Sequence, residues 1–188
     1  MKLYLYLKFL LVLIAFSLIS SAGAQSLRAE RKLIMEGNRL YVERKFKDAA
    51  VKYEEALAAN PESAVAKYNL GMSRIRQVAN PKDTSTYNSK LLDEGTRRLS
   101  EVASMAREKP GLASKANYNL GNLSFNREDF ASAISFYKEA LRIDPKDMNA
   151  RKNLRIAQLK QQQNQNQQNQ DQKRDQQKEK NISQQTAN

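Results

Sequence analysis

The segments ANYNLG (residues 116–121) and AKYNLG (residues 66–71) are nearly identical and lie fifty positions apart. The similarity extends beyond these segments. The residues 12, 16, 19 and 24 positions after Gly121 have the same types as the residues at the same distances after Gly37. The matched residues are Gly37, Ala49, Tyr53, Ala56 and Pro61 in one stretch and Gly121, Ala133, Tyr137, Ala140 and Pro145 in the other. The chain therefore contains an internal repeat.

The distances between equivalent residues give the period of this repeat. Gly37 and Gly71 are 34 residues apart, and so are Asn119 and Asn153. Gly71 and Gly121 are 50 residues apart, which is one period with 16 additional residues. The repeat is therefore interrupted once, and the additional residues lie in its middle copy.

Each copy has the pattern of two helices. Apolar residues recur three and four positions apart, as they do on one face of an amphipathic helix. The residue before a proline is disfavoured in helical geometry, so Asn60-Pro61 and Asp144-Pro145 are expected to end the second helix of their copies. We expect Gly37, Gly71 and Gly121 to face a partner helix, where a side chain would hold the two backbones apart.

A period of 34 residues, with small residues, aromatic residues and a closing proline at these steps, resembles the tetratricopeptide repeat. The resemblance implies an all-α solenoid of three helical hairpins with a C-terminal capping helix and a concave inner face. The domain is expected to span residues 27–160. Its expected parts are repeats at about 30–63, 64–113 and 114–147 and a cap at 148–160.

The middle copy holds the insertion. Residues 79–90 read ANPKDTSTYNSK, a composition typical of a loop. We expect its second helix to resume near Leu91 and Pro110 to close the copy late. The favoured interpretation is a tolerated surface insertion, and a binding role for the loop is the alternative.

The two ends of the chain differ in composition from the repeats between them. Residues 1–24 combine Lys2 and Lys8 with an apolar stretch and a small-residue segment, which predicts a signal peptide or, alternatively, an uncleaved anchor. The protein is then exported and periplasmic, and an uncleaved N-terminus would hold it at the membrane. Residues 161–188 are rich in Gln, Asn and Lys, and they predict a disordered tail or a frayed continuation of the last helix.

Composition limits the possible chemistry. The chain has no Cys and no His, which excludes disulfides, Cys or His metal sites and nucleophiles that depend on either residue. The sequence brings no two carboxylates together in a cleft. We therefore expect no enzymatic activity, no catalytic residues, no metal and no cofactor.

The resemblance also implies where a partner would bind. The first helix of each hairpin lines the concave face in this family, and that face would bind an extended or helical segment of a partner protein. Some of its aromatic residues could instead belong to the core between repeats. The groove candidates are Ile34, Asn38, Tyr41, Tyr68, Met72, Ile75, Arg76, Lys115, Tyr118, Asn122, Phe125, Asn126 and Lys152, with Val42, Val65 and Ile156 beside them.

The charge balance adds a second hypothesis. The formal net charge is +12, and the basic residues are scattered along the chain. Scattered charge does not form the stripe that nucleic-acid binding requires, so no nucleic-acid partner is expected. An acidic partner or peripheral association with an anionic membrane is more consistent with it. The alternative function is therefore a basic spacer on the membrane or envelope surface, without a specific peptide groove.

The order of the segments carries a narrower resemblance. A leader, a full repeat, a stretched repeat, a full repeat with YNLGN and YKEALRIDPKD, a NARKNLRIAQ cap and a polar tail follow one another. This order is similar to that of the BatC-type exported proteins of the Bacteroidetes aerotolerance (Bat) operon. The resemblance implies a scaffold that assembles with membrane-anchored von Willebrand factor A-domain Bat proteins.

Overall fold

The computed structural model describes residues 25–78, 82 and 85–186. The leader expected at residues 1–24 lies outside this part of the chain. Within the described residues, no helix combines the length and the apolar character needed to cross a bilayer.

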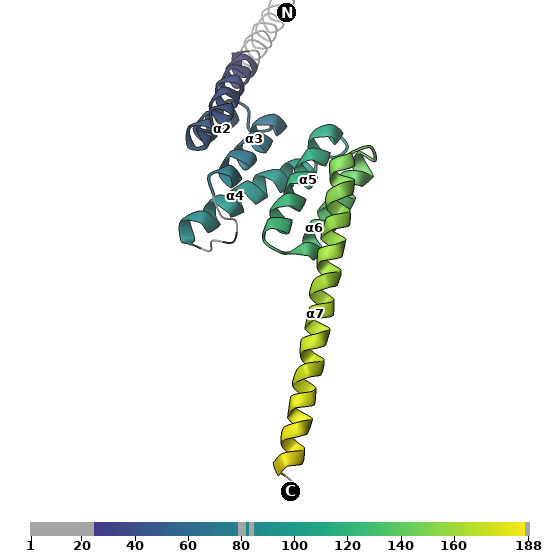
Figure 1. The fold of residues 1–188 in the computed structure, drawn as a ribbon. Coiled ribbons are helices and arrows are strands. Elements are labelled where there is room, and N and C mark those ends of the chain that lie inside the picture. The colour runs from purple at the N-terminus through teal and green to yellow at the C-terminus, as the bar shows by residue number, and fades with distance from the viewer. Residues whose placement is uncertain (1–24, 79–81, 83–84, 187–188) are drawn as a thin grey trace, which may run out of the picture. The chain divides into compact units, whose positions relative to one another are not determined.

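The regular elements of the described residues are all helices, which confirms the all-α class and agrees with the tetratricopeptide solenoid (Figure 1). The chain divides into two compact units, Met1–Met105 and Ala106–Asn188. The first unit contains the helix at residues 25–42, here called the N-terminal helix, and α2 (Phe46–Ala59), α3 (Ala64–Arg76) and α4 (Thr86–Ala103). The second contains α5 (Pro110–Asn126), α6 (Phe130–Ile143) and α7 (Met148–Thr186).

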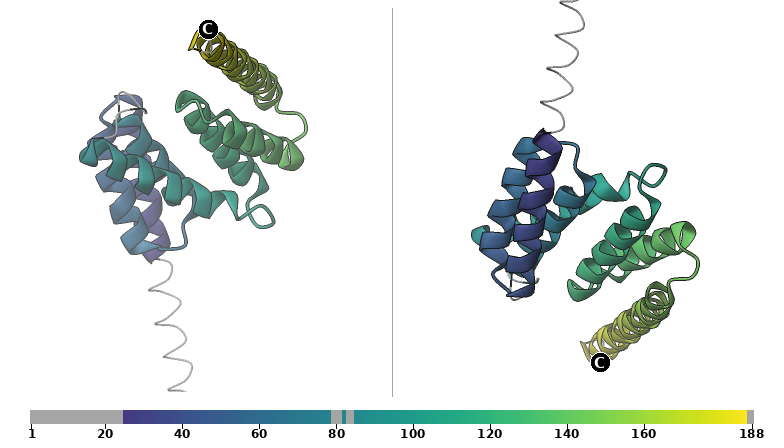
Figure 2. Two further views of the ribbon diagram at one scale, coloured as in Figure 1. Left: turned by 90° about the horizontal axis from the view of Figure 1, so that it is seen from below. Right: turned by 90° about the horizontal axis from the view of Figure 1, so that it is seen from above.

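Neighbouring helices along the chain pack against each other inside each unit. In the first unit α2 packs on α3 and α3 on α4, and in the second α5 packs on α6 and α6 on α7. The two views in Figure 2 show α5 and α6 as a hairpin beside the first turns of α7. Each unit is therefore a stack of helices that lie next to each other in sequence.

A tyrosine covers the glycine in the first and third repeats. A Cβ atom built on Gly37 would lie 2.6 Å from Cε1 of Tyr53, and one built on Gly121 would lie 2.6 Å from Cε1 of Tyr137. Both tyrosines are 1% exposed. Each glycine thus makes room for an aromatic ring from the second helix of its own hairpin.

The middle repeat packs differently because it has no such tyrosine. Leu99 stands at that place and is fully buried. A Cβ atom on Gly71 would lie 3.0 Å from the carbonyl oxygen of Gly95, so α3 and α4 approach each other through their backbones. The smaller Leu side chain, together with glycine on both helices, permits this closer contact.

The first helix of the first and third repeats ends in the same left-handed turn. Arg44 has φ 60° and Glu128 has φ 63°. The amide of Lys45 donates to the carbonyl of Leu40 (2.9 Å), and the amide of Asp129 donates to that of Ser124 (3.0 Å). These bonds across six residues satisfy free carbonyls at the helix end.

Replacing Glu128 with Gly should stabilise the second unit. A non-glycine residue in left-handed geometry costs about 1 kcal/mol, so Glu128→Gly should raise the free energy of unfolding by about that amount. Chemical denaturation of the purified chain measures the change. Glu128→Ala is the matched control, because it removes the same side chain and keeps the backbone cost. An equal gain in both variants would contradict the explanation.

The structure corrects two expected boundaries in the middle repeat. The second helix does not resume near Leu91, because α4 begins at Thr86. Pro110 does not close the repeat either, since it occupies the first turn of α5, where a proline without an amide hydrogen is well tolerated. The additional residues are therefore shared among a longer segment between α3 and α4, a longer α4, the following link and an earlier start of α5.

The tail also differs from the expectation of disorder. The capping helix continues as one helix of 39 residues, α7, to Thr186 (Figure 1). The physical reason lies in its composition, because Gln, Lys, Arg and Glu have favourable helix propensities and neither Gly nor Pro follows Pro145. Continuation of the last helix was the alternative that the sequence left open.

Candidate functional site

The residues predicted to line a groove fall into two sets, one in each unit. Ile34, Asn38, Tyr41, Tyr68, Met72, Ile75 and Arg76 belong to the N-terminal helix and α3, while Lys115, Tyr118, Asn122, Phe125, Asn126 and Lys152 belong to α5 and α7. In each set, the residues come from the first helices of two consecutive repeats. Each unit therefore presents a candidate surface of its own.

The first unit has a pocket between the N-terminal helix and α3. Its volume is about 270 Å³, and most of its lining is apolar or aromatic. Five of the residues predicted at the groove, Val42 among them, meet there together with two others. The complete lining is Asn38, Tyr41, Val42, Tyr53, Tyr68, Asn69 and Met72.

Asn38 is held in place at this pocket by two hydrogen bonds. The Tyr53 hydroxyl donates to Oδ1 of Asn38 at 2.8 Å, and Nδ2 of Asn69 donates to the same oxygen at 2.9 Å. Both bonds engage the side-chain oxygen. The Nδ2 group of Asn38 has no partner among the described residues, so the pocket carries an oriented hydrogen-bond donor.

The second unit repeats this arrangement. The Tyr137 hydroxyl donates to Oδ1 of Asn122 at 2.8 Å, and Nδ2 of Asn153 donates to it at 3.0 Å. Asn153 also donates to the Tyr118 hydroxyl at 3.3 Å. We call these two sets, Asn38–Tyr53–Asn69 and Asn122–Tyr137–Asn153, the asparagine nodes. They join three helices in each unit.

Sequence reasoning missed Asn69 and Asn153 as part of the site. Their signal was present, because an Asn-Leu pair precedes the glycine position in YNLG and in the equivalent KNLR of the cap. The middle repeat has Met72 and Leu99 at the places of the node asparagine and tyrosine. Those side chains have no comparable donor or acceptor, so this repeat cannot form a node of its own.

Several predicted groove residues take part in packing instead. A Cβ atom on Gly95 would lie 2.7 Å from Cγ1 of Ile75, so Ile75 contacts α4 inside its own hairpin. The guanidinium of Arg76 lies 5.6 Å from the ring centroid of Phe46 on α2. Phe125 forms an edge-to-face contact with Phe130 of α6, with ring centroids 5.3 Å apart.

The other residues predicted to line the groove differ in how far their side chains are exposed to solvent. Tyr118 lies against Tyr137, with ring centroids 6.0 Å apart, and belongs to the core of the second unit. Ile34 is half-buried and does not line the pocket of the first unit. Lys115, Asn126 and Lys152 are exposed.

Burial changes the acidity of the two node tyrosines. It raises the pKa of Tyr53 and that of Tyr137 from the ordinary value of 10.0 to about 12. The cause is the loss of hydration that an ionised phenolate would need. Both hydroxyls therefore remain donors to their asparagines throughout the neutral range.

This shift predicts a loss of stability in alkali. Between pH 10 and 12 the unfolded chain releases protons that the folded tyrosines keep, so the free energy of unfolding should fall as the pH rises through this window. Below pH 10 the two states bind the same tyrosine protons, and the effect vanishes. Denaturation curves across this range, with tyrosinate absorbance, measure it.

The control for the alkaline effect is the double variant Tyr53→Phe/Tyr137→Phe. It keeps both rings and removes both ionisable hydroxyls, so its free energy of unfolding should depend less steeply on pH. Lysine ionisation affects both proteins alike and cancels in the comparison. Identical slopes in the two proteins would show that the node tyrosines ionise as freely in the folded state as in the unfolded one.

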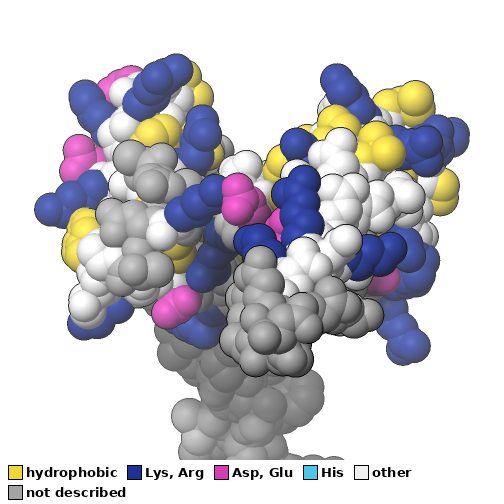
Figure 3. All heavy atoms as spheres, turned by 60° about the horizontal axis from the view of Figure 1, so that its bottom comes forward, with side chains coloured by type: hydrophobic (Ala, Val, Ile, Leu, Met, Phe, Trp, Pro, Cys, Tyr) yellow, Lys and Arg dark blue, Asp and Glu magenta, His cyan; other side chains and the backbone are white. Residues whose placement is uncertain are grey.

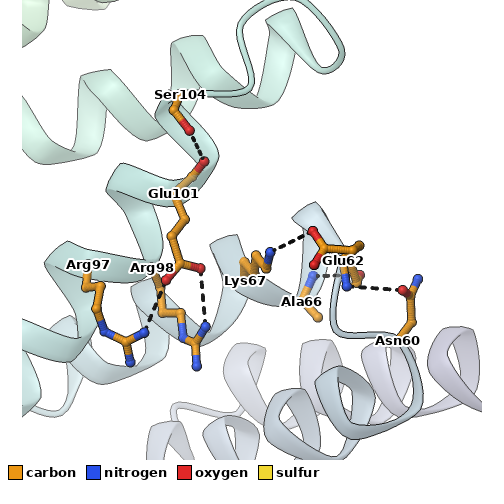
Figure 4. Close-up of polar contacts among 9 residues, drawn as sticks. Asn60, Glu62, Ala66, Lys67, Arg97, Arg98, Glu101 and Ser104 are labelled. Carbon is orange, nitrogen blue, oxygen red and sulfur yellow. Dashed lines mark hydrogen bonds and ion pairs between the residues drawn. The ribbon is translucent and has the colours of Figure 1, made fainter.

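Many charged side chains of the described residues form ion pairs with each other. Glu101 pairs with both Arg97 and Arg98 on α4, and Lys67 pairs with Glu62 (Figure 4). On the face shown in Figure 3, Lys and Arg side chains are dispersed instead of forming one stripe. Among the described residues, no group of three or more His, Cys, Asp or Glu could hold a metal ion.

Two of the carboxylates have local structural roles. The side chain of Asp129 caps α6 by accepting from the amide of Ser132 at 3.0 Å, and its hydrogen bonds to Ser132 lower the pKa of that carboxyl. Glu139 is bound by Arg142, whose hydrogen bond lowers the pKa of this carboxyl as well. These lowered pKa values come from a helix cap and a surface ion pair.

Comparison with protein-family models identifies the class of the chain. Residues 34–96 match one tetratricopeptide repeat model, and residues 114–147 match another. Together the two matches cover slightly more than half of the 188 residues. The chain belongs to the tetratricopeptide repeat proteins, which generally serve as scaffolds for protein–protein interaction and generally have no enzymatic activity.

Proposed function

We propose that this protein is a non-enzymatic scaffold that binds a segment of a partner protein in the pocket of its first unit. We further propose that the scaffold is exported to the periplasm by residues 1–24. Its partners there would be membrane-anchored von Willebrand factor A-domain proteins of a Bat-type complex. The order of repeats, insertion, cap and polar tail supports the narrower assignment.

The observation that carries the proposal is the combination of an apolar pocket with one oriented polar group. Tyr41, Val42, Tyr68 and Met72 provide apolar contact area, while Nδ2 of Asn38 provides a donor. Binding sites commonly combine an apolar lining with a few positioned polar groups. This pocket therefore suits an aliphatic or aromatic side chain of the partner together with an adjacent backbone carbonyl.

The asparagine node prepares this donor before binding. Tyr53 and Asn69 fix the Asn38 amide from two different helices. A group that is already oriented loses little conformational freedom when a partner arrives, which favours affinity. The node thus links the packing of the first repeat to the chemistry of the pocket.

The experiment that tests the function is a binding titration with the purified von Willebrand factor A domain of a Bat-type partner. Met72→Glu places a carboxylate in the apolar pocket and should weaken binding at least about tenfold, because burial of an unpaired charge is unfavourable. Val51→Glu is the matched control, since Val51 is 45% exposed on α2 and lies outside the pocket. Circular dichroism checks that both variants remain folded.

The two variants separate the possible results. Loss of binding in Met72→Glu with retention in Val51→Glu supports the pocket as the docking site. Equal affinity of the Met72→Glu variant and the natural protein would refute a role for the pocket. Failure of the natural protein to bind the domain would refute the Bat-type assignment and leave the pocket to be tested with other envelope proteins.

A further inference from the structure

The first turns of α7 have one packed face and one open face. Ala150 and Ala157 are fully buried against the rest of the second unit, and Leu154 packs on the cluster around Tyr137. On the other side, three large apolar side chains are exposed. We call the residues on that side, Met148, Lys152, Arg155, Ile156 and Leu159, the outer face of α7, because their spacing of three and four places them together.

The three large apolar residues of the outer face are exposed to solvent. Met148 is 66% exposed, Ile156 37% and Leu159 44%. A single exposed apolar residue needs no explanation, but three on one face of one helix form a patch. This patch lies on the side of α7 away from Ala150 and Ala157.

The same turns carry positive charge that the protein does not neutralise. Arg151, Lys152, Arg155 and Lys160 are exposed, and in the described part of the chain none of them forms an ion pair. Arg151 donates to the carbonyl of Pro145 at 2.6 Å, which leaves its charge uncompensated. Residues 148–170 contain no Asp or Glu. The outer face is therefore both apolar and strongly cationic.

The shape of this face is unfavourable for another closely packed helix. Arg155 occupies the place that Gly121 has one period earlier, where Tyr137 of α6 packs directly on the glycine. A long charged side chain at that place keeps a further helix away. The exposed apolar residues are also few, while a stable protein interface buries about 800 Å² on each partner.

A lipid surface has no such requirement for shape. We propose that the outer face of α7 binds an anionic lipid surface. Met148, Ile156 and Leu159 contact the headgroup region, and the cations bind lipid phosphates while their aliphatic stems lie along the apolar boundary. The outer face of α7 and the pocket around Asn38 lie in different units. Lipid binding by this face therefore does not depend on the partner proposed for the pocket.

The test is a vesicle-binding assay with the full chain. Vesicles of phosphatidylglycerol mixed with phosphatidylcholine are compared with vesicles of phosphatidylcholine alone. The apolar stretch at residues 9–19 could itself enter a bilayer, so the readout is the difference between the two kinds of vesicle. We expect selective binding to the anionic vesicles, weakened by salt because exposed charges are screened.

Two matched charge reversals on the same helix locate the binding face. Lys152→Glu/Arg155→Glu should weaken anionic vesicle binding by at least about 30-fold, since each cation near such a surface contributes a factor of about five. Arg174→Glu/Lys178→Glu changes the net charge equally, but these cations already pair with Asp171 and Asp175. This control should change binding by less than about threefold.

Three further outcomes would overturn the inference. Equal loss in the two double variants would reduce the effect to net charge and overturn it. Equal binding to anionic and neutral vesicles would also overturn it. If the protein binds no vesicles but binds an acidic helical peptide, and Lys152→Glu/Arg155→Glu releases that peptide, the face belongs to a protein partner. The Met72→Glu variant should keep its vesicle binding, which separates this inference from the proposed function.

Discussion

Replacement of Tyr137 by Ala is expected to remove about 3–5 kcal/mol from the free energy of unfolding of the second unit, the range for loss of a large buried aromatic side chain. The ring is 1% exposed and lies over Gly121. It also packs with Ala133 and Ala157, so α5, α6 and α7 all line the space that would be left empty. Chemical denaturation followed by circular dichroism measures the loss.

Tyr137→Phe is the matched control for this experiment. It keeps the ring and removes only the donor to Asn122, whose oxygen still accepts from Asn153. Loss of one hydrogen bond with a remaining donor should cost about 1 kcal/mol. If the two variants lose equal stability, the hydroxyl dominates and the packing explanation is wrong.

Replacement of Ala133 by Leu is expected to cost about 1–3 kcal/mol through overpacking. Ala133 is fully buried beside Tyr137, at the centre of the core of the second unit. Three additional carbon atoms can be accommodated there only by displacing the Tyr137 ring or separating the helices. The thermal midpoint should fall with the free energy of unfolding.

Ala131→Leu is the control, because it makes the same chemical change two residues earlier on an exposed face of α6. It should alter the free energy of unfolding by less than about 0.5 kcal/mol. An unchanged thermal midpoint in Ala133→Leu would show that the small residue is not needed for close packing. Amide hydrogen exchange in α5 and α6 can assign any loss to the second unit.

The packing residues and the candidate site are physically connected. Tyr53 fills the core of the first repeat and also orients Asn38 at the pocket. The equivalent ring of Tyr137 does the same for Asn122. A change that loosens either ring should therefore affect stability and the orientation of a polar group at once, so binding variants need a stability measurement beside them.

Part of the candidate site could be predicted from the sequence. The resemblance to the tetratricopeptide repeat placed Asn38, Tyr41, Tyr68 and Met72 on the concave face, and the structure brings these four together in one pocket. The period alone did not separate surface from packing. Ile75 has the same helical spacing as these residues but contacts Gly95 within its own hairpin.

The middle repeat shows why boundaries were harder to predict than the repeat itself. Gly95 and Leu99 follow the pattern of small and large residues, so the existence of the second helix was clear. Its start was not, because Thr86 and Tyr87 have the composition of a loop although they begin α4. Pro110 is ambiguous for a similar reason, since proline is compatible with both the end and the first turn of a helix.

By itself, the sequence determined the all-α class, the period and the residues that let helices nest, because these follow from local spacing and side-chain size. The tertiary structure alone decided that Tyr53 and Tyr137 lie over glycines and hold asparagines, and that the outer face of α7 remains open. The physical reason is that hydrogen bonds and burial depend on side chains from helices distant in sequence. A linear pattern places residues on a helix face, but only packing determines what that face meets.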